Sequence, residues 1–261
     1  MHGWMGKLLH IDLGARTSHT EDWDPALLRG YLGGRGLGVK LYADATGAGQ
    51  DPFAPDNKLI FATGPLTSTS LHTTGRFAVI SRSPLTGTIC DANSGGSWGV
   101  WFKGTGHDAV VIDGAADAPV YLLITPDGVE FRDAAPLWGK DCPTTRDTII
   151  ADCPKGTRVA SIGPAGENRV LLAAIMNDTD RALGRGGMGA VMGSKTLKAI
   201  AVHGKQRPTL ADPDTCKELT ATTKQVLKKN PVTSSALPTL GTSVLVNVIN
   251  EHGMFPTRNF Q

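Results

Sequence analysis

Apolar residues occur in short runs through the first 205 residues, separated by turns rich in Gly, Pro, Asn and Asp. Runs of this length and spacing are typical of β-strands. One helix is expected here, because Asp24 and Pro25 offer an N-cap and a first-turn proline for a helix toward Tyr31. With so few helical patterns, we predict an α+β domain with much antiparallel sheet. The predicted strands cover 6–13, 58–62, 77–81, 109–112, 120–124, 159–162, 170–175 and 199–202.

The pattern changes after Pro208. Asp212 and Pro213 predict a helix that continues to about Lys229, and a second helix is expected over 242–251, closed by Gly253 in the left-handed conformation. Two such helices cannot bury their own apolar faces. We therefore expect two domains, 1–208 and 209–261, of which the second is the truncated beginning of an all-helical domain.

Two stretches of the first domain repeat. The run 60–65, IFATGP, resembles 159–164, VASIGP, and NSGG at 93–96 leading to DAVVIDG at 108–114 resembles GRGG at 184–187 leading to KAIAVHG at 198–204. The copies are 90 to 99 residues apart, a spacing that suits a duplicated half-domain with two Gly-rich loops related by a pseudo-two-fold axis. Coincidence in a Gly-rich chain is the alternative.

Charge is nearly balanced overall but not locally. The 261 residues include 32 glycines, 40% hydrophobic and 19% charged residues, with a net charge of +2. This composition excludes wholesale disorder, and it gives no case for binding nucleic acid or membranes through bulk charge. Two segments, 57–90 and 181–207, hold basic but no acidic residues. Arginine beside paired glycines suits a phosphate cradle, whereas a solvated basic face with turn glycines is the alternative.

Generic motifs explain little of the chain. The string GMGAVMGSKT at 187–196 nearly matches a P-loop, but Ser194 separates Gly193 from Lys195 where that motif needs Gly-Lys. The four cysteines have no CxxC spacing and are expected to be reduced and half-buried. Glu167 is expected to stabilise a turn. The sequence shows no signal peptide and no stretch of 18 apolar residues, so we expect a soluble cytoplasmic protein without a membrane span.

The same loops carry a more specific resemblance. Residues 3–208 resemble the N-terminal domain of the aldehyde:ferredoxin oxidoreductase family of tungsten enzymes, and GTSVLVNVINEHGMFPTRNFQ at 241–261 resembles the opening of its helical second domain. The motifs that carry the first resemblance are ATGPLTST at 62–69, GRF at 75–77, SPLTG at 83–87, NSGG at 93–96, LWGK at 137–140, SIGPAGEN at 161–168, AAIMND at 173–178 and GRGGMGAVMGSKTLKAIAV at 184–202.

This resemblance implies a tungsten or molybdenum cofactor held by the dithiolenes of two pterins, with no protein ligand to the metal. Asn93 and Ala182 would offer backbone carbonyls to a magnesium ion that bridges the two pterin phosphates. Leu183 stands where many relatives have a small residue. The residues implied to contact the pterins or their phosphates are Arg76, Asn93, Gly95, Arg181, Ala182, Gly184 and Arg185.

The resemblance also implies oxidation of a small-molecule aldehyde to its carboxylic acid, with electrons passed through a 4Fe-4S cluster to ferredoxin. In the family the cluster cysteines and the substrate pocket belong to later domains. We therefore name no catalytic residue in this chain, do not expect this segment to bind the cluster, and expect the fragment alone to be inactive. A homo-oligomer or larger redox complex is expected, with the missing C-terminal domains as partners and with no nucleic acid or membrane.

Three other functions stay open at this point. The chain could be a stand-alone pterin- or phosphate-binding module. It could be a nucleotide-binding enzyme that uses the loop 184–196. It could also belong to a family relative that acts on another substrate, such as an aromatic acid derivative.

Overall fold

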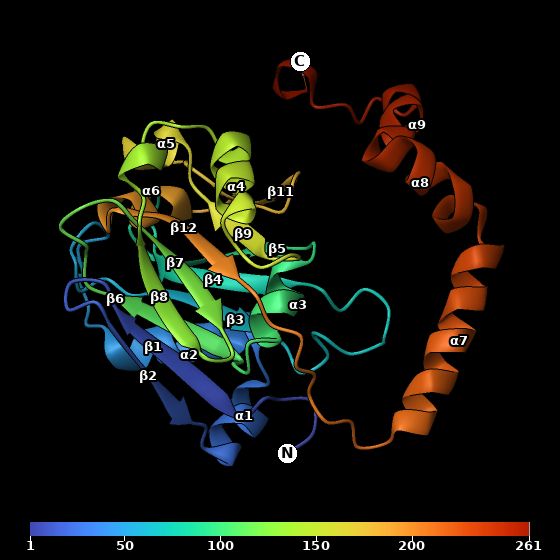
Figure 1. Ribbon diagram of the computed structural model, residues 1–261. Helices are drawn as coiled ribbons and strands as arrows, with labels where there is room; N and C mark the ends of the chain where they lie inside the picture. Colours follow the sequence, from blue (N-terminus) through green and yellow to red (C-terminus); the bar gives the residue numbers. More distant parts are fainter. Residues whose placement is uncertain (261) are drawn as a thin grey trace. The chain divides into compact units, whose positions relative to one another are not determined.

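In residues 1–260, which the computed structural model describes, the strands form two six-stranded mixed sheets (Figure 1). The first sheet has the order β2 (Thr17–Asp22), β1 (Lys7–Asp12), β6 (Ala109–Asp113), β3 (Leu59–Thr63), β4 (Phe77–Arg82) and β5 (Ile89–Ser94). The second has the order β8 (Gly128–Asp133), β7 (Val120–Thr125), β12 (Leu197–Val202), β9 (Arg158–Ser161), β10 (Ile175–Asn177) and β11 (Arg181–Leu183).

The two sheets have the same topology. In each, a hairpin (β1–β2 or β7–β8) joins the rest through one parallel pair, β1–β6 or β7–β12. The remaining pairs are antiparallel and follow the same order, β6–β3–β4–β5 and β12–β9–β10–β11. The predicted duplication is therefore confirmed: β1–β6 form a first half and β7–β12 a second half.

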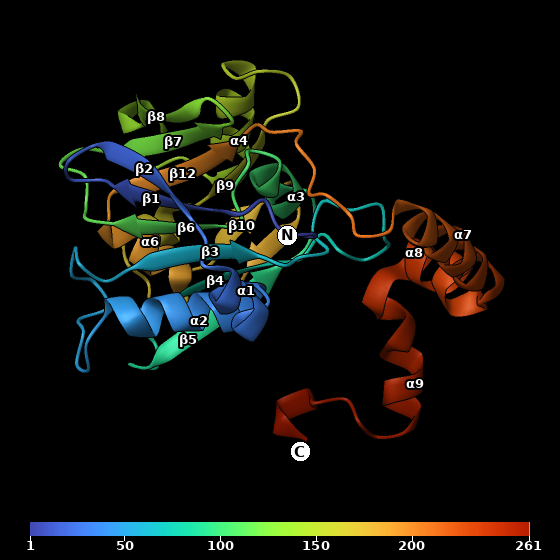
Figure 2. The same ribbon diagram turned by 90° about the horizontal axis from the view of Figure 1, so that it is seen from below.

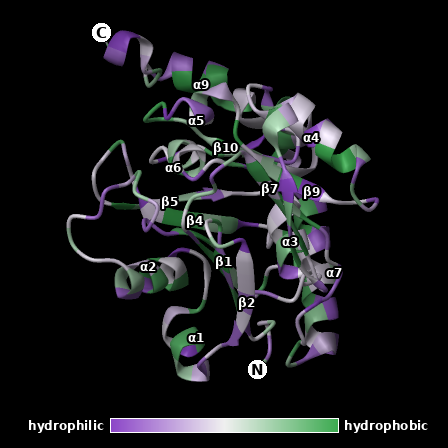
Figure 3. Ribbon diagram, turned by 60° about the vertical axis from the view of Figure 1, so that its left-hand side comes forward, coloured by the Kyte–Doolittle hydropathy of each residue, from purple (hydrophilic) through white to green (hydrophobic). Residues whose placement is uncertain are grey.

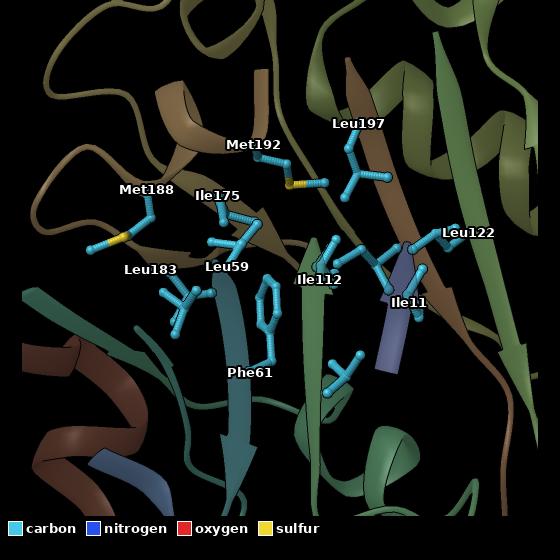
Figure 4. Close-up of a cluster of buried hydrophobic side chains, with 14 of the residues drawn as sticks. Ile11, Leu59, Phe61, Ile112, Leu122, Ile175, Leu183, Met188, Met192 and Leu197 are labelled. Atoms are coloured by element: carbon cyan, nitrogen blue, oxygen red, sulfur yellow. The ribbon is translucent and has the colours of Figure 1, made fainter. Parts of the chain in front are cut away.

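One apolar core lies between the sheets. Phe61 and Val79 of the first sheet and Leu122 and Ile200 of the second belong to the same buried cluster, part of which Figure 4 shows. Alternate residues of the same strands face outward, as the period of a strand requires. On the first sheet this outer face is covered by the helix α2, Gly34–Ala45 (Figure 2), and on the second by the helix α4, Cys142–Ala151.

Helices lie between the strands at matching points of the two halves. Asp24 Oδ1 accepts a hydrogen bond from Ala26 N at 2.8 Å, so the predicted N-cap is confirmed. α3 precedes β6, and α6 precedes β12. The helices of the sheet unit are α1 (Pro25–Tyr31), α2 (Gly34–Ala45), α3 (Trp98–Lys103), α4 (Cys142–Ala151), α5 (Pro164–Glu167) and α6 (Met188–Ser194), with a 3₁₀ turn at Ala135–Leu137.

The chain divides into two units, 1–69 with 73–211, and 70–72 with the residues from Asp212 onward. In the second unit, Asp212 Oδ1 accepts from Thr215 N at 2.9 Å and begins the predicted helix α7 (Pro213–Lys229). Hydrophobic and hydrophilic segments both occur along α7 (Figure 3). The helix expected over 242–251 is a 3₁₀ segment, Gly241–Leu245, followed by α9 (Val246–Glu251), and Gly253 has the expected positive φ of 65°. The other segments are Val232–Ala236 (π), α8 (Leu237–Leu240) and Thr257–Asn259 (3₁₀).

The helical run 232–251 differs from the expectation that the chain has no possible membrane span. The run has 20 residues, and an 18-residue window in it has a mean hydropathy of 1.4, which is enough, by length and composition, for a membrane span; that window is unburied. The sequence predicted no membrane span, because it contains no stretch of 18 apolar residues. Length and composition are the only features that indicate a span.

Most apolar runs form strands as predicted, but the prediction of a strand over 170–175 was wrong. Only Ile175 belongs to a strand, and Val170, Leu171 and Leu172 form an exposed loop. The missed strands are edge strands (β2, β5, β8 and β11). One face or more of such a strand meets solvent, so polar residues dilute the apolar signal.

Candidate functional site

β5 is an edge strand of the first sheet and β11 is an edge strand of the second. These two strands lie against each other. At this junction an open pocket of about 550 Å³ is lined by Arg76, Asn93, Ala182, Gly184 and Arg185. Five of the seven residues that sequence analysis assigned to the cofactor are thus brought together from both halves. No acidic residue is among the described residues that line this pocket.

Asn93 and Ala182 occupy equivalent register positions in the two halves. Asn93 pairs with Ala78, which pairs with Ala62. Ala182 pairs with Met176, which pairs with Ser161. Ala62 and Ser161 are the matching residues of the internal repeat. The pseudo-two-fold of the fold therefore relates the two backbones from which the magnesium carbonyls are expected, although the side chains differ.

This register refines the sequence repeat. The strings NSGG and GRGG align Asn93 with Gly184, whereas the strand pairing aligns it with Ala182. The two alignments therefore differ by two residues after the ends of β5 and β11. A loop alignment cannot reveal such a shift, but ladder register does.

Two guanidinium groups give the pocket its charge. Arg76 Nη1 donates to Asn93 Oδ1 at 2.7 Å, so this exposed arginine is held at the pocket wall. Arg185 is also exposed and lies near Cys90. Burial raises the pKa of the Cys90 thiol although Arg185 opposes this shift, so the thiol stays neutral near pH 7. A pair of planar cations in a pocket whose lining holds no carboxylate suits a phosphate ligand.

The remaining two assigned residues lie beside the pocket. The Gly95 carbonyl accepts a hydrogen bond from Asn177 Nδ2 at 3.0 Å. Arg181 begins β11, is exposed, and has Nε 3.8 Å from Asp180 Oδ1. Neither belongs to the pocket lining.

Two lysines of the basic segment 181–207 do not contribute to an anion-binding surface. Lys195 and Lys198 are fully buried. Lys195 Nζ donates to the carbonyls of Pro55 and Gly114 at 2.8 and 2.9 Å, and burial lowers its pKa to about 8. Lys198 Nζ donates to Lys140 O at 2.8 Å and forms an ion pair with Glu167. These two lysines are therefore buried structural groups and do not face a ligand.

The neighbouring motifs are structural. Glu167 accepts from Gly139 N at 2.8 Å, which agrees with its expected role in holding a turn. The near P-loop string forms the fully buried helix α6, so its backbone amides are not presented to a nucleotide. Leu183 is also fully buried, in the core between the sheets (Figure 4), and its larger side chain does not line the pocket.

Two polar residues beside the pocket, Asn177 and Asp178, were not predicted as part of the site. Asn177 ends β10 and is 1% exposed, and Asp178 has a positive φ of 53°. Their side chains bond to the segment 94–98, more than 75 positions away. The motif AAIMND contained both, but a contact of such long range has no local sequence signal.

Within residues 1–260, cysteine and histidine side chains form no second metal centre. All four cysteines are free and partly buried, as expected. Among the described residues, no three His, Cys, Asp or Glu side chains come together as metal ligands. Trp98 lies in the core and its Nε1 donates to Ile200 O at 3.0 Å, linking the two halves.

Family models match nearly the whole chain. Residues 8–204 match the family described as aldehyde ferredoxin oxidoreductase, N-terminal domain. Residues 218–261 match aldehyde ferredoxin oxidoreductase, domains 2 and 3. Both matches agree with the resemblance found in the sequence.

Individual relatives extend this result. The chain is 50% identical, over its full length, to a tungsten-containing aldehyde ferredoxin oxidoreductase of Pyrococcus abyssi, and it spans 43% of that protein. It is 34% identical over 78% of its length to 35% of an aliphatic sulfonate oxidoreductase, WOR-like subunit, of Pyrococcus furiosus. A chain of the active-site complex BamBC of benzoyl coenzyme A reductase, solved with 1,5-dienoyl-CoA, shares the fold with a TM-score of 0.84 and 35% identity, over 87% of this chain and 35% of that one.

Proposed function

The chain belongs to the aldehyde ferredoxin oxidoreductase family, and on that premise we propose that it is the N-terminal, cofactor-binding part of an oxidoreductase that converts aldehydes to carboxylic acids. The observation that carries this proposal is the single pocket that unites Arg76 and Asn93 of the first half with Ala182 and Arg185 of the second. The identity of 50% to a tungsten-containing aldehyde ferredoxin oxidoreductase supports the cofactor class.

The residues present fit a tungsten bis-pterin with a magnesium ion. Two guanidiniums without a competing carboxylate fit two phosphates. Magnesium prefers oxygen ligands, and the backbones of Asn93 and Ala182 offer two carbonyls from equivalent positions. Gly184 leaves room for a close approach to the backbone, because a Cβ there would meet only Ala182 Cβ within 4 Å, at 3.9 Å.

Within this proposal each residue has a limited task. Arg76 and Arg185 bind and orient the phosphates, and the carbonyls of Asn93 and Ala182 hold the magnesium ion. When bound, the metal centre supplies the two-electron redox chemistry and the transfer of oxygen from water. The residues of this chain supply placement and charge.

The remaining parts of the proposal concern the whole enzyme. Because the chain spans 43% of the relatives, we assign the 4Fe-4S cluster and the aldehyde pocket to the domains that follow in those proteins. Ferredoxin is the proposed electron acceptor, in the cytoplasm, and a homo-oligomer or larger redox complex the proposed assembly. The 261 residues alone should therefore show no aldehyde-dependent reduction of a viologen dye, and robust activity would contradict this division of labour.

The site assignment is tested by removing the side chains of both pocket arginines. Arg76→Ala with Arg185→Ala, in the full-length enzyme, should abolish retention of tungsten, since each charge-assisted contact contributes about 1.5–3 kcal/mol. Metal analysis of the purified protein measures this directly. Arg16→Ala with Arg29→Ala is the matched control, because these exposed arginines do not line the pocket. Normal tungsten content in the first double variant would exclude this site.

A family relative with another substrate is the second candidate. It is favoured by the fold shared, at 35% identity, with the benzoyl coenzyme A reductase complex. The pocket described here faces the cofactor and does not choose the substrate. Turnover of the loaded full-length enzyme with aldehydes, with an aliphatic sulfonate and with an aromatic acyl-CoA distinguishes the two functions.

A further inference from the structure

β5 and β11 present the two expected magnesium carbonyls but belong to different sheets. No ladder pairing joins these two strands in the part of the chain that the structure describes. Magnesium requires near-octahedral geometry with oxygens at about 2.0–2.1 Å, so two carbonyls on one ion must lie within about 4 Å of each other. Contacts other than a ladder must therefore fix the spacing of the strands.

Asn177 provides the first of these contacts. Its Oδ1 accepts from Ser94 Oγ at 2.7 Å, and its Nδ2 donates to Gly95 O at 3.0 Å. Both partners directly follow Asn93 in the chain. Asn177 itself lies five positions before Ala182, on the strand that pairs with β11.

Asp178 provides the second contact, at the start of α3. Its Oδ2 accepts from Ser97 N at 2.7 Å and from Trp98 N at 3.3 Å, and its Oδ1 accepts from Ser97 Oγ at 2.7 Å. Asn177 Nδ2 also donates to Asp178 Oδ2 at 3.0 Å, so the two side chains act as one unit. The carboxylate thus binds the chain just after the Gly95-Gly96 turn.

Gly96 shows how closely the two segments meet. Its φ is +85°, and a Cβ at this position would lie 2.1 Å from Asp178 Oδ2 and 3.2 Å from Arg181 Cγ. Only glycine, which has no Cβ, allows the Asp178 carboxylate to approach the backbone this closely. The turn before Ala182 is therefore packed directly on the backbone that follows Asn93.

The first half shows that the fold itself does not need a polar residue here. By strand register, the equivalent of Asn177 is Val79, which is fully buried in the core. A valine at this position is sufficient for an intact sheet. A buried amide costs free energy unless it is hydrogen-bonded, and the bonds of Asn177 go to the segment that carries Asn93.

We propose that Asn177 and Asp178 are positioning residues that hold the Asn93 and Ala182 carbonyls at the spacing required by one magnesium ion. This inference rests on the proposed function. It adds two residues outside the pocket lining, and it makes the spacing a property of the chain before the cofactor binds.

The test uses Asn177→Val, which copies the first half, and Asp178→Asn, which keeps the shape of the side chain. Asp117→Asn is the control, because Asp117 is exposed and does not line the pocket. In the cofactor-loaded full-length enzyme, tungsten retained after dialysis is measured at a series of free Mg²⁺ concentrations. We expect each variant to raise the magnesium concentration for half retention about tenfold or more, and the control to leave it unchanged.

A second readout uses the metal-free protein. Amide hydrogen exchange at residues 95–98 should be faster in both variants than in the wild type and the control. Faster exchange with an unchanged magnesium midpoint would overturn the proposal, because the two residues would then serve the fold alone. Retention that no magnesium concentration restores would overturn it as well.

Failure of the proposed function itself looks different. In that case the wild-type enzyme would retain tungsten independently of magnesium, and Arg76→Ala with Arg185→Ala would leave tungsten content normal.

Discussion

The two halves of the sheet unit share a topology but bury opposite charges at one equivalent position. Asp108 precedes β6, is 1% exposed, and accepts from Met5 N and Gly6 N at 3.0 and 2.9 Å. Lys198, its equivalent in the second half, is fully buried and pairs with Glu167. A fold can therefore tolerate either sign at this position, provided that local partners satisfy the buried group.

At the pocket, the two halves share a backbone position but not a side chain. Asn93 and Ala182 are equivalent by register but have unlike side chains. The halves share main-chain geometry at this place rather than side-chain chemistry. This is what a site needs when its metal ligands are backbone carbonyls, and it explains how a duplicated fold could serve a two-fold cofactor after its sequences had diverged.

The largest effect is expected from breaking the buried Lys198–Glu167 pair of the second half. Lys198→Met should destabilise the protein by about 3–5 kcal/mol, because Glu167, 4% exposed, is left without its cation. The free energy of unfolding from urea titration measures this loss. Lys198→Met combined with Glu167→Gln should regain at least half of it, and a double variant less stable than the single one would contradict the explanation.

His107 gives the first half a pH dependence at a position where the second half has Leu197. Thr105 Oγ1 donates to Phe102 O, so it accepts from His107 Nδ1, and Thr20 Oγ1 lies 3.2 Å from Nε2. Burial, aided by Lys7, lowers the pKa of His107 from 6.5 to about 4. The unfolded chain therefore binds a proton below pH 6.5 that the folded chain takes up only near pH 4.

Stability from this group should be complete above pH 6.5 and fall by up to about 3 kcal/mol as the pH drops to 4. His107→Leu copies Leu197, the equivalent residue of the second half. It should flatten this part of the profile of unfolding free energy against pH. An unchanged slope between pH 6.5 and 4 would show that other groups cause it.

Two glycines with nearly the same φ allow the cost of backbone strain to be separated from the cost of a steric clash. Gly187 has φ +71° and Gly87 has φ +70°, but only at Gly187 would a Cβ meet the chain, 2.0 Å from Leu171 O. Both alanine variants incur the left-handed penalty of about 1–2 kcal/mol. Gly187→Ala should cost about 1–3 kcal/mol more, measured as the difference in unfolding free energy, and equal losses would show that the loop 170–172 yields freely.

The smallest effect is expected at Asn93. Asn93→Ala makes the side chain the same as that of Ala182 and leaves the carbonyl in place. It removes the bond from Arg76, which costs about 0.5–1.5 kcal/mol, so magnesium and tungsten content should stay near normal by metal analysis. Loss of magnesium as severe as in the double arginine variant would mean that the Asn93 side chain is the ligand.

The sequence was sufficient for the features that depend on local pattern. The buried strands β3, β6, β7 and β12 follow from apolar runs, and the starts of α1 and α7 follow from an Asp-Pro pair. α6 could not be found in this way, because GMGAVMGS is Gly-rich and buried on all sides, which removes the helical period.

The candidate site was predicted from a resemblance to known motifs and not from residue pattern alone. Asn93 and Ala182 meet only because two edge strands of separate sheets do. Asn177 and Asp178 were missed for the same reason, since their partners lie 80 or more positions away. The internal repeat suggested that two loops were related, but only strand register showed which residues correspond.

The central claim, that the pseudo-two-fold brings two equivalent carbonyls to one ion, is tested most directly by a high-resolution structure of the tungsten-loaded enzyme. We predict one magnesium ion with Asn93 O and Ala182 O both at about 2.0–2.1 Å, and Arg76 and Arg185 each on a pterin phosphate. A magnesium ion bound by only one of these carbonyls, or pterin phosphates held outside this pocket, would contradict the account.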